Sequence, residues 1–238
     1  MKMRVVGLAG IGALLALAAC RKDKSETQLR LQVVHEVGGQ PLYFDSLMYT
    51  NVAGERFSIS SLKYYLSDFR FYDKGRLVYT ADTTLYIDAA SAPATLTFSD
   101  SSETDFDSIA CFVGVPPSRN IHDRLAPTME NTAMEWPDMM GGGYHFLKFE
   151  GHWSAGAPVA GFAVHLGTDP YLVTAGCHAP GNWPRTGWRQ MRLVFDAAEW
   201  FKTPYTYSFA ADGVYTMSDT SLMRKIRDNG KDVLRIKL

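Results

Sequence analysis

Apolar and polar residues alternate in several short stretches of the chain. In residues 29–37, leucine or valine occupies nearly every second position, and His35 falls on the apolar side. Residues 144–153, 159–167 and 233–238 show a similar period of two. Successive side chains of a strand point to opposite faces, so this pattern predicts strands with one buried face. Further strands are expected at residues 55–59, 62–72 and 205–209, and a loop is expected at residues 169–186.

Helical spacing is confined to one clear segment near the C-terminus. Residues 220–228 carry apolar side chains at helical intervals, with Asp219 or Thr220 as the cap and Asn229-Gly230 as a stop signal. Residues 119–137 have no clean period and predict a long irregular loop, a kind of segment that often carries function. The pattern predicts an all-β fold: an antiparallel, Greek-key-like β-sandwich with a long irregular loop and one short C-terminal helix.

The two expected strands at 144–153 and 159–167 are joined by a short Gly- and Pro-containing turn, which predicts a hairpin. If the turn centres near Ala155, His145 lies directly opposite His165, with Cβ atoms roughly 4.5–5.5 Å apart. Two imidazoles at that distance can bind one metal ion through bonds of about 2 Å. A single histidine on an apolar strand face is more often a core residue satisfied by a hydrogen bond, and this interpretation stays open for each residue.

The N-terminus has the features of an export signal. A basic start and an apolar run end in Leu-Ala-Ala-Cys20, which is similar to a bacterial lipobox and implies cleavage and acylation at Cys20. We therefore expect a lipoprotein signal peptide at residues 1–19, a lipid-anchored tether at residues 20–28, and a folded domain at residues 29–238 in the cell envelope. The partner implied by the lipid is the membrane. A net charge of −1 and the lack of a basic patch argue against nucleic acid.

Three further groups of residues have more than one interpretation. Cys111 and Cys177 are a candidate disulfide in an oxidising compartment, or else two buried thiols, or Cys177 could act with His178 as a metal ligand. Residues 99–108 hold four carboxylates, which could bind calcium, but they lack the ordered Asp-x-Asp-x-Asp-Gly spacing of a calcium loop, which favours a solvated loop. The methionines around Trp136 are either soft ligands for Cu(I) or packing residues: Met134, Met139 and Met140.

Four segments follow one another along the chain: His35-Glu-Val-Gly-Gly-Gln-Pro-Leu42, Leu62-Lys-Tyr-Tyr-Leu-Ser67, Trp136 through Gly151, and His165-Leu-Gly167. Their order resembles that of the MbnP-like family. The family consists of extracytoplasmic copper-binding proteins related to methanobactin-associated and methanotroph surface copper proteins. The resemblance implies a β-sandwich-like domain that binds copper through histidines and an oxidised tryptophan, kynurenine. It also implies a di-haem cytochrome c peroxidase-type partner that makes this modification.

Position by position, the resemblance assigns the metal to His35, His145 and His165, which the alternation places on the inward faces of their strands. Trp136 is the candidate for oxidation. Here the chain departs from the family pattern, because Trp136 is followed by Pro-Asp-Met-Met-Gly-Gly-Gly instead of a second aromatic and a polar residue. His152 and His178 are further candidates to complete the site.

The resulting hypothesis is a lipid-anchored copper-binding protein for copper uptake, storage or delivery. The alternative is a non-metal surface module that binds a glycan or a partner protein through exposed aromatic residues. We do not expect an enzyme, since the chain has neither a Gly-x-Ser-x-Gly elbow nor a His-Glu-x-x-His motif.

Overall fold

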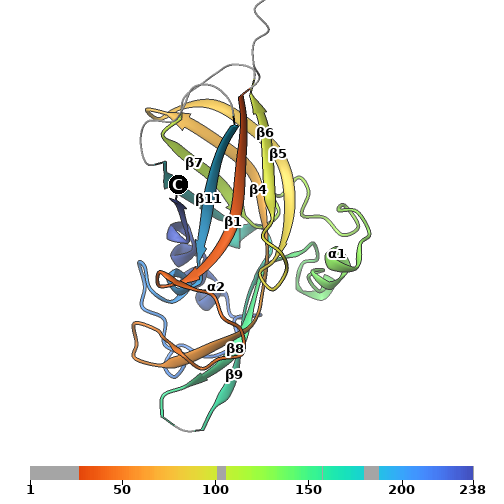
Figure 1. The fold of residues 1–238 in the computed structure, drawn as a ribbon. Helices are drawn as coiled ribbons and strands as arrows, with labels where there is room; N and C mark the ends of the chain where they lie inside the picture. Colours follow the sequence, from red (N-terminus) through yellow and green to blue (C-terminus); the bar gives the residue numbers. More distant parts are fainter. Residues whose placement is uncertain (1–26, 101–105, 157, 180–187, 238) are drawn as a thin grey trace, which may run out of the picture.

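The computed structural model describes residues 27–100, 106–156, 158–179 and 188–237. Two sheets face each other across one hydrophobic core (Figure 1). The expected signal peptide and Cys20 lie outside the described residues, and so does the centre of the acidic segment 99–108. Within the described part, no helix has the length and apolar character needed to cross a membrane.

The smaller sheet has five strands and is built around the first one. Its order is β12-β11-β1-β2, with β6 also pairing with β1. β1 and β11 run parallel, whereas the other pairs are antiparallel. The strands span β1 (Thr27–Val37), β2 (Gln40–Pro41), β6 (Thr95–Asp100), β11 (Trp188–Asp196) and β12 (Leu234–Lys237).

The larger sheet has seven strands around the 18-residue strand β4 (Arg56–Asp73). Its order is β10-β7-β4-β8-β9, and β3 and β5 also pair with β4. All these pairs are antiparallel. The remaining strands are β3 (Tyr49–Thr50), β5 (Arg76–Asp88), β7 (Ser108–Val113), β8 (His145–Ser154), β9 (Ala160–Gly167) and β10 (Val173–His178).

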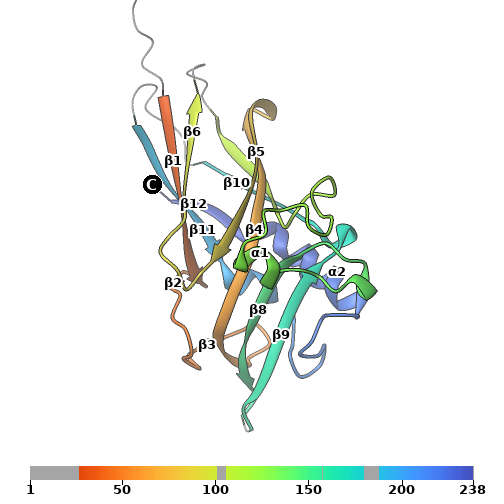
Figure 2. The ribbon, with the colours of Figure 1, turned by 90° about the vertical axis from the view of Figure 1, so that its right-hand side faces the viewer.

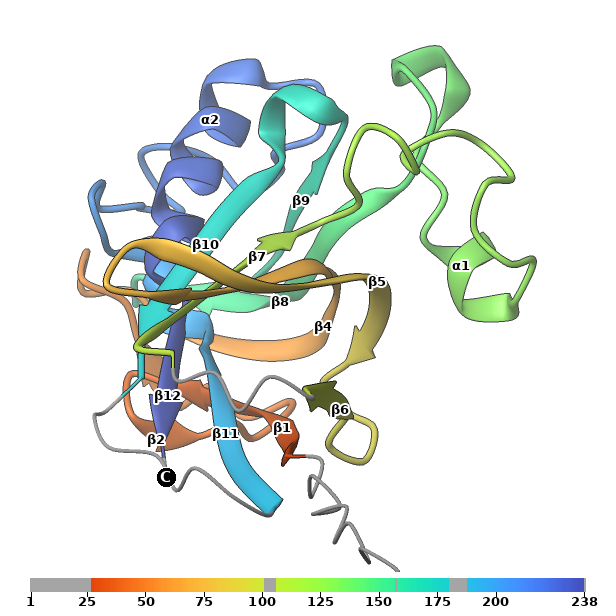
Figure 3. The same ribbon diagram turned by 90° about the horizontal axis from the view of Figure 1, so that it is seen from above.

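Aromatic side chains fill the space between the sheets. Tyr64 of β4 stacks on Phe195 of β11 with ring centres 4.1 Å apart, which joins the two layers. Figure 3 shows the layers from above. We call the side of the seven-stranded sheet that faces β1 and β11 its inner face, and the opposite side its outer face. Residues that pair across neighbouring strands share a face, so Tyr64, Leu147 and Leu166 mark the inner one.

The expected all-β sandwich with a helix near the C-terminus is confirmed, and four details differ. The parallel β1–β11 pair was not expected. The strands expected at residues 55–59 and 62–72 are one strand, β4, with a register shift between Ile59 and Ser61. Residues 205–209 form no strand, while β10 lies inside the expected loop 169–186. Strand pairing is decided by partners far away in sequence, so short segments are poorly predicted by local pattern.

Helix α2 (Thr220–Asn229) confirms the expected C-terminal helix. The Asp219 carboxylate accepts hydrogen bonds from the backbone N–H groups of Ser221 and Leu222 and so caps the helix. The apolar side of α2 is buried. Shorter helical segments are η2 (Asp169–Tyr171), η3 (Ala197–Phe201) and η4 (Gly230–Asp232).

Residues 114–144 form a long excursion that covers part of the outer face of the seven-stranded sheet (Figure 2). It contains α1 (Met129–Ala133) and η1 (Asp138–Met140). Tyr65 of β4 donates to Asn131 over 2.7 Å, which ties α1 to this face. Arg119 pairs with Asp68 and donates to Thr84, which ties the start of the excursion to β4 and β5. The expected irregular loop is therefore present and held firmly against the sheet.

The candidate disulfide is absent, because Cys111 and Cys177 are both free thiols. In the β7–β10 pair, Cys111 lies opposite Ala175 and Cys177 lies opposite Ile109. The cysteines are therefore diagonal neighbours, whose Cα atoms are about 7–8 Å apart in a typical sheet. That distance exceeds the roughly 4.4–6.8 Å that a disulfide bridges. The interpretation as two free thiols is the correct one.

Candidate metal centre

A β-bulge in β8 decides where His145 points. His145 pairs with Gly167 and Leu147 pairs with Leu166, so Phe146 is an extra residue on the β8 side. An inserted residue inverts the alternation of faces beyond it. His145 therefore shares the outer face with His165 instead of the inner face with Leu147. The bulge lies where β7 ends beside β8: a Cβ on Gly114 would come within 2.6 Å of the Phe146 ring.

The expected register of the hairpin was wrong, but the expected meeting of the two histidines is correct. His165 pairs with Lys148 rather than with His145. The bulge nevertheless brings the two rings together, with centres 5.2 Å apart and planes at 85°. Two imidazoles that share a metal ion at about 2 Å from each bound nitrogen have ring centres roughly 5–6 Å apart. The observed spacing fits a shared ion.

Residues 214–217 lie along the free edge of β9 and position His165. The Ala163 N–H donates to the carbonyl of Val214, and the His165 N–H donates to the Thr216 hydroxyl over 2.7 Å. The Thr216 hydroxyl donates in turn to the His165 carbonyl. This connection covers part of an otherwise open sheet edge. It also places Met217 beside the imidazole.

Each imidazole has one nitrogen engaged by an oxygen acceptor. The Nδ1 atom of His145 lies 3.2 Å from the Met134 carbonyl oxygen, which can only accept, so Nδ1 carries the proton and Nε2 keeps its lone pair. The Nε2 atom of His165 lies 2.8 Å from Glu150 Oε1, so Nε2 is protonated and Nδ1 keeps its lone pair. Such acceptors are typical of metal-binding histidines, whose orientation and tautomer they determine.

The lone pair of His165 faces a sulfur atom. Its Nδ1 atom lies 3.3 Å from the Sδ atom of Met217. His145 Nε2, His165 Nδ1 and Met217 Sδ therefore form a candidate set of two imidazole nitrogens and one thioether. Met217 was not identified from the sequence, because it lies 52 residues after His165 and reaches it only through the edge pairing of residues 214–216.

Burial keeps both imidazoles neutral. His145 is 6 % exposed and His165 is 9 % exposed. Desolvation, together with the neighbouring His165, lowers the pKa of His145 to about 4. Desolvation also lowers the pKa of His165, although the Glu150 carboxylate opposes the shift. Neutral imidazoles with free lone pairs are the form that binds a metal ion near neutral pH.

Trp136 forms one wall of the centre. Its ring centre lies 4.7 Å from that of His145, and its Nε1–H donates to the Met140 carbonyl over 3.1 Å. The indole packs flat against β9 where residue 167 has no side chain: a Cβ on Gly167 would lie 2.2 Å from Trp136 Cε3. The candidate for oxidation is therefore in contact with a candidate ligand.

His35 does not belong to this centre, which corrects the expected three-histidine site. It lies on β1, and its Nε2 atom is 2.8 Å from the hydroxyl of Tyr64, a residue of the inner face. His145 and His165 lie on the outer face, so β4 and the thickness of its sheet separate the two groups. The alternation placed all three side chains inward, and this was wrong for the pair because their buried environment is the excursion and not the sandwich core.

The other candidates are also dispersed. Met139 is 94 % exposed, whereas the carbonyls of Met134 and Met140 act as acceptors within the centre. His152 and His178 are exposed and lie at other positions of the sheet. Among the residues that the structure describes, neither approaches His145.

Comparisons with known proteins agree with this fold. The MbnP family model matches residues 26–218 of the chain. Among solved structures, MbnP from Methylosinus trichosporium is similar with a TM-score of 0.57 and 13 % sequence identity, covering 89 % of this chain and 98 % of that chain. No curated protein shows significant similarity. At this identity the structural likeness concerns the fold, and the family assignment comes from the sequence match.

Proposed function

Because the chain belongs to the MbnP family, we propose that it is an extracytoplasmic, lipid-anchored copper-binding protein that serves copper uptake, storage or delivery. The observation that carries the proposal is the contact between His145 and His165, whose ring centres are 5.2 Å apart. The Met217 thioether completes a set of three donors at one place on the outer face.

The donor types favour copper over other metals. Imidazole binds zinc, copper, iron and nickel, whereas a neutral thioether selects for soft Cu(I). The centre is buried by Trp136 and the excursion, so a bound ion would be shielded from water. Bound copper would be held by His145 Nε2, His165 Nδ1 and Met217 Sδ, with Glu150 and the Met134 carbonyl orienting the rings. A buried set of neutral donors supports binding and transfer of Cu(I).

Trp136 is the residue we propose to be oxidised to kynurenine, in a reaction that depends on a di-haem cytochrome c peroxidase-type partner. Its contact with His145 supports the assignment, because an oxygenated product would arise beside the copper ligands. Peptide mass spectrometry of protein from its native host tests it. The expected result is a mass gain at Trp136 equal to one carbon lost and one oxygen gained, and an unmodified peptide would exclude it.

The copper site is tested by competition between the metal-free protein and a chromophoric Cu(I) chelator. We expect one copper ion per chain in the native protein. His145→Asn and His165→Asn should lose it, and Met217→Leu should weaken it because leucine keeps the volume but has no sulfur. Asparagine at position 145 retains a donor for the Met134 carbonyl, which limits damage to the fold.

Two matched controls separate this site from the other histidines. His35→Ala removes the histidine on the inner face, and His152→Ala removes an exposed one on the same strand as His145. Both should bind copper like the native protein. Retention of copper by a folded variant lacking both His145 and His165 would refute the site. Absence of copper from the native protein would favour the surface module that binds a glycan or a protein.

A further inference from the structure

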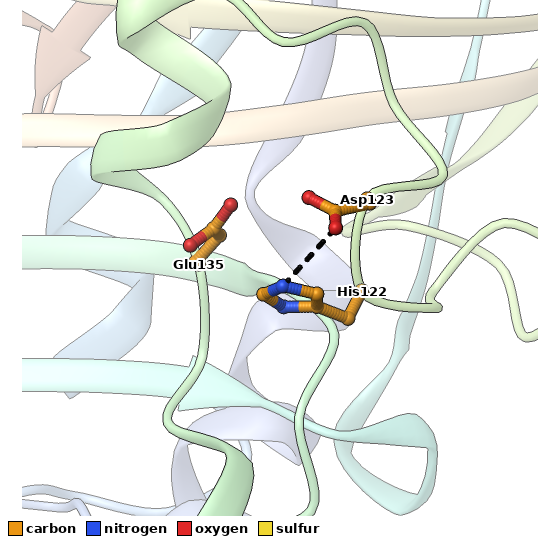
Figure 4. Close-up of side chains that lie close together, drawn as sticks. All are labelled: His122, Asp123 and Glu135. Carbon is orange, nitrogen blue, oxygen red and sulfur yellow. Dashed lines mark ion pairs between the residues drawn. The ribbon is translucent and has the colours of Figure 1, made fainter.

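A second group of metal-binding side chains lies on the excursion, outside the copper centre. His122, Asp123 and Glu135 each present a ligand atom, and these atoms all lie within 4.8 Å of one another. Figure 4 shows the imidazole between the two carboxylates. A hollow of about 380 Å³ adjoins the group and is lined by His122, Glu135 and Asp138 together with Trp136. The group is open to solvent, in contrast to the buried centre.

Backbone contacts hold this group in place. The Asn120 side-chain oxygen accepts from the Tyr144 N–H over 2.8 Å, and the Leu125 N–H donates to the Tyr144 hydroxyl over 3.0 Å. Tyr144 also forms a β-bridge with Glu135. Asn120 and Leu125, which flank His122 and Asp123, are thus both bonded to Tyr144, the residue that pairs with Glu135. Gly143 allows this approach, since a Cβ there would lie 2.3 Å from the Asn120 side-chain oxygen.

The distances suit a small divalent cation. His122 Nε2 lies 3.4 Å from Asp123 Oδ2. Two ligands bound tetrahedrally at about 2.1 Å from an ion are roughly 3.4 Å apart. The other ring nitrogen, Nδ1, lies 3.7 Å from Asp138 Oδ1, so a carboxylate is placed to orient the ring while Nε2 binds the metal. One imidazole and two carboxylates carry charge that a divalent ion would balance.

We propose that His122, Asp123 and Glu135 form a surface site for a divalent transition-metal ion of zinc type, with Asp138 as a positioning residue. Nitrogen and oxygen donors without sulfur suit Zn²⁺ and not Cu(I), whereas the buried centre has a thioether. Glu135 directly precedes Trp136 in the chain, and water in the adjoining hollow can supply remaining ligands. No motif spacing in the sequence indicates this site, since Glu135 lies 13 residues after His122 and 12 residues after Asp123.

Isothermal titration of the full chain with Zn²⁺ tests the proposal, with His145→Asn present in every sample so that the buried centre cannot contribute. We expect one zinc ion per chain in this background. Adding His122→Asn or Glu135→Gln should abolish binding, and adding Asp138→Asn should weaken it by about 10- to 100-fold, as expected for a residue that orients a ligand. The control His152→Asn changes an exposed histidine elsewhere and should have no effect.

The outcomes are distinguishable from those of the copper experiment. Zinc binding that is unaffected by His122→Asn and Glu135→Gln would overturn the proposal, and so would absence of zinc binding in the His145→Asn background with native circular dichroism. The three substituted positions of the group, His122, Glu135 and Asp138, lie on the excursion and outside the sandwich core, so the variants should fold. If the native protein binds no copper while the His145→Asn variant binds zinc, the copper centre alone is refuted. If the native protein binds copper while the His145→Asn variant binds no zinc, the surface site alone is refuted.

Discussion

The packing of Trp136 against Gly167 makes a quantitative prediction. In Gly167→Ala, the new methyl group would lie 2.2 Å from Trp136 Cε3. An ordinary carbon–carbon contact is about 3.5 Å or longer, so the indole has to move by more than about 1 Å. Overpacking of a buried site costs about 1–3 kcal/mol.

The movement also disturbs a hydrogen bond. Trp136 Nε1 is 3.1 Å from the Met140 carbonyl oxygen, and the shift would break this bond, at a cost of about 0.5–1.5 kcal/mol. The total loss of unfolding free energy is therefore about 2–4 kcal/mol. For a domain of this size, that corresponds to a decrease in Tm of roughly 5–15 °C.

Urea denaturation followed by circular dichroism measures this loss, and chelator competition on the same variant measures the copper affinity, which should fall because Trp136 contacts His145. Gly161→Ala is the matched control. Gly161 lies on the same strand and face, but a Cβ there would meet its nearest atom only at 3.8 Å. If Gly167→Ala unfolded within about 0.5 kcal/mol of Gly161→Ala, the proposed packing of the indole would be wrong.

Three further predictions concern other buried groups. Desolvation lowers the pKa of His35 to about 4, so the unfolded chain binds more protons than the folded chain between pH 6.5 and 4. The unfolding free energy of metal-free protein should therefore decrease as the pH falls through this window. Urea titrations at pH 7 and pH 4 measure the decrease, and His35→Gln should remove up to about 3 kcal/mol of it. Glu55 accepts hydrogen bonds from Asn51, Ser208 and two backbone N–H groups, so Glu55→Ala should cost about 3 kcal/mol or more by thermal denaturation, and a change below 1 kcal/mol would contradict this role. Cys111 is buried and Cys177 is half-buried, and this desolvation raises the pKa of both thiols, that of Cys177 to about 12. Neither thiol should therefore react rapidly with Ellman's reagent at pH 8 until urea is added, and a rapid reaction of the native protein would contradict this expectation.

Local pattern identified most of the elements that carry the candidate metal centre. The period of two placed strands at β1, β8 and β9, and the helical spacing with its cap placed α2. These features depend on neighbouring residues only, because strand alternation and helix capping are local properties of the chain. The irregular composition of residues 119–137 likewise indicated the excursion.

The composition of the centre depended on contacts that the pattern does not contain. The alternation assigned His145 to the face of Leu147, whereas the bulge at Phe146 inverts it. His35 satisfies the same inward pattern as the pair, yet it packs against Tyr64 on the other side of the sheet. Alternation tells only which side chains of one strand point to the same side. The arrangement of the surrounding strands and loops decides which residues those side chains contact.

The sequence by itself determined that this protein is a β-sandwich of the MbnP type, that His145 and His165 approach each other, and that Trp136 precedes them on a glycine-rich segment. The tertiary structure alone decided that the pair lies on the outer face, that Met217 supplies sulfur to it, and that His122 meets Glu135. The physical reason is the range of the interactions. Hydrophobic alternation acts between neighbours in the chain, whereas edge pairing, bulges and loop packing join residues tens of positions apart, and their outcome depends on the whole fold.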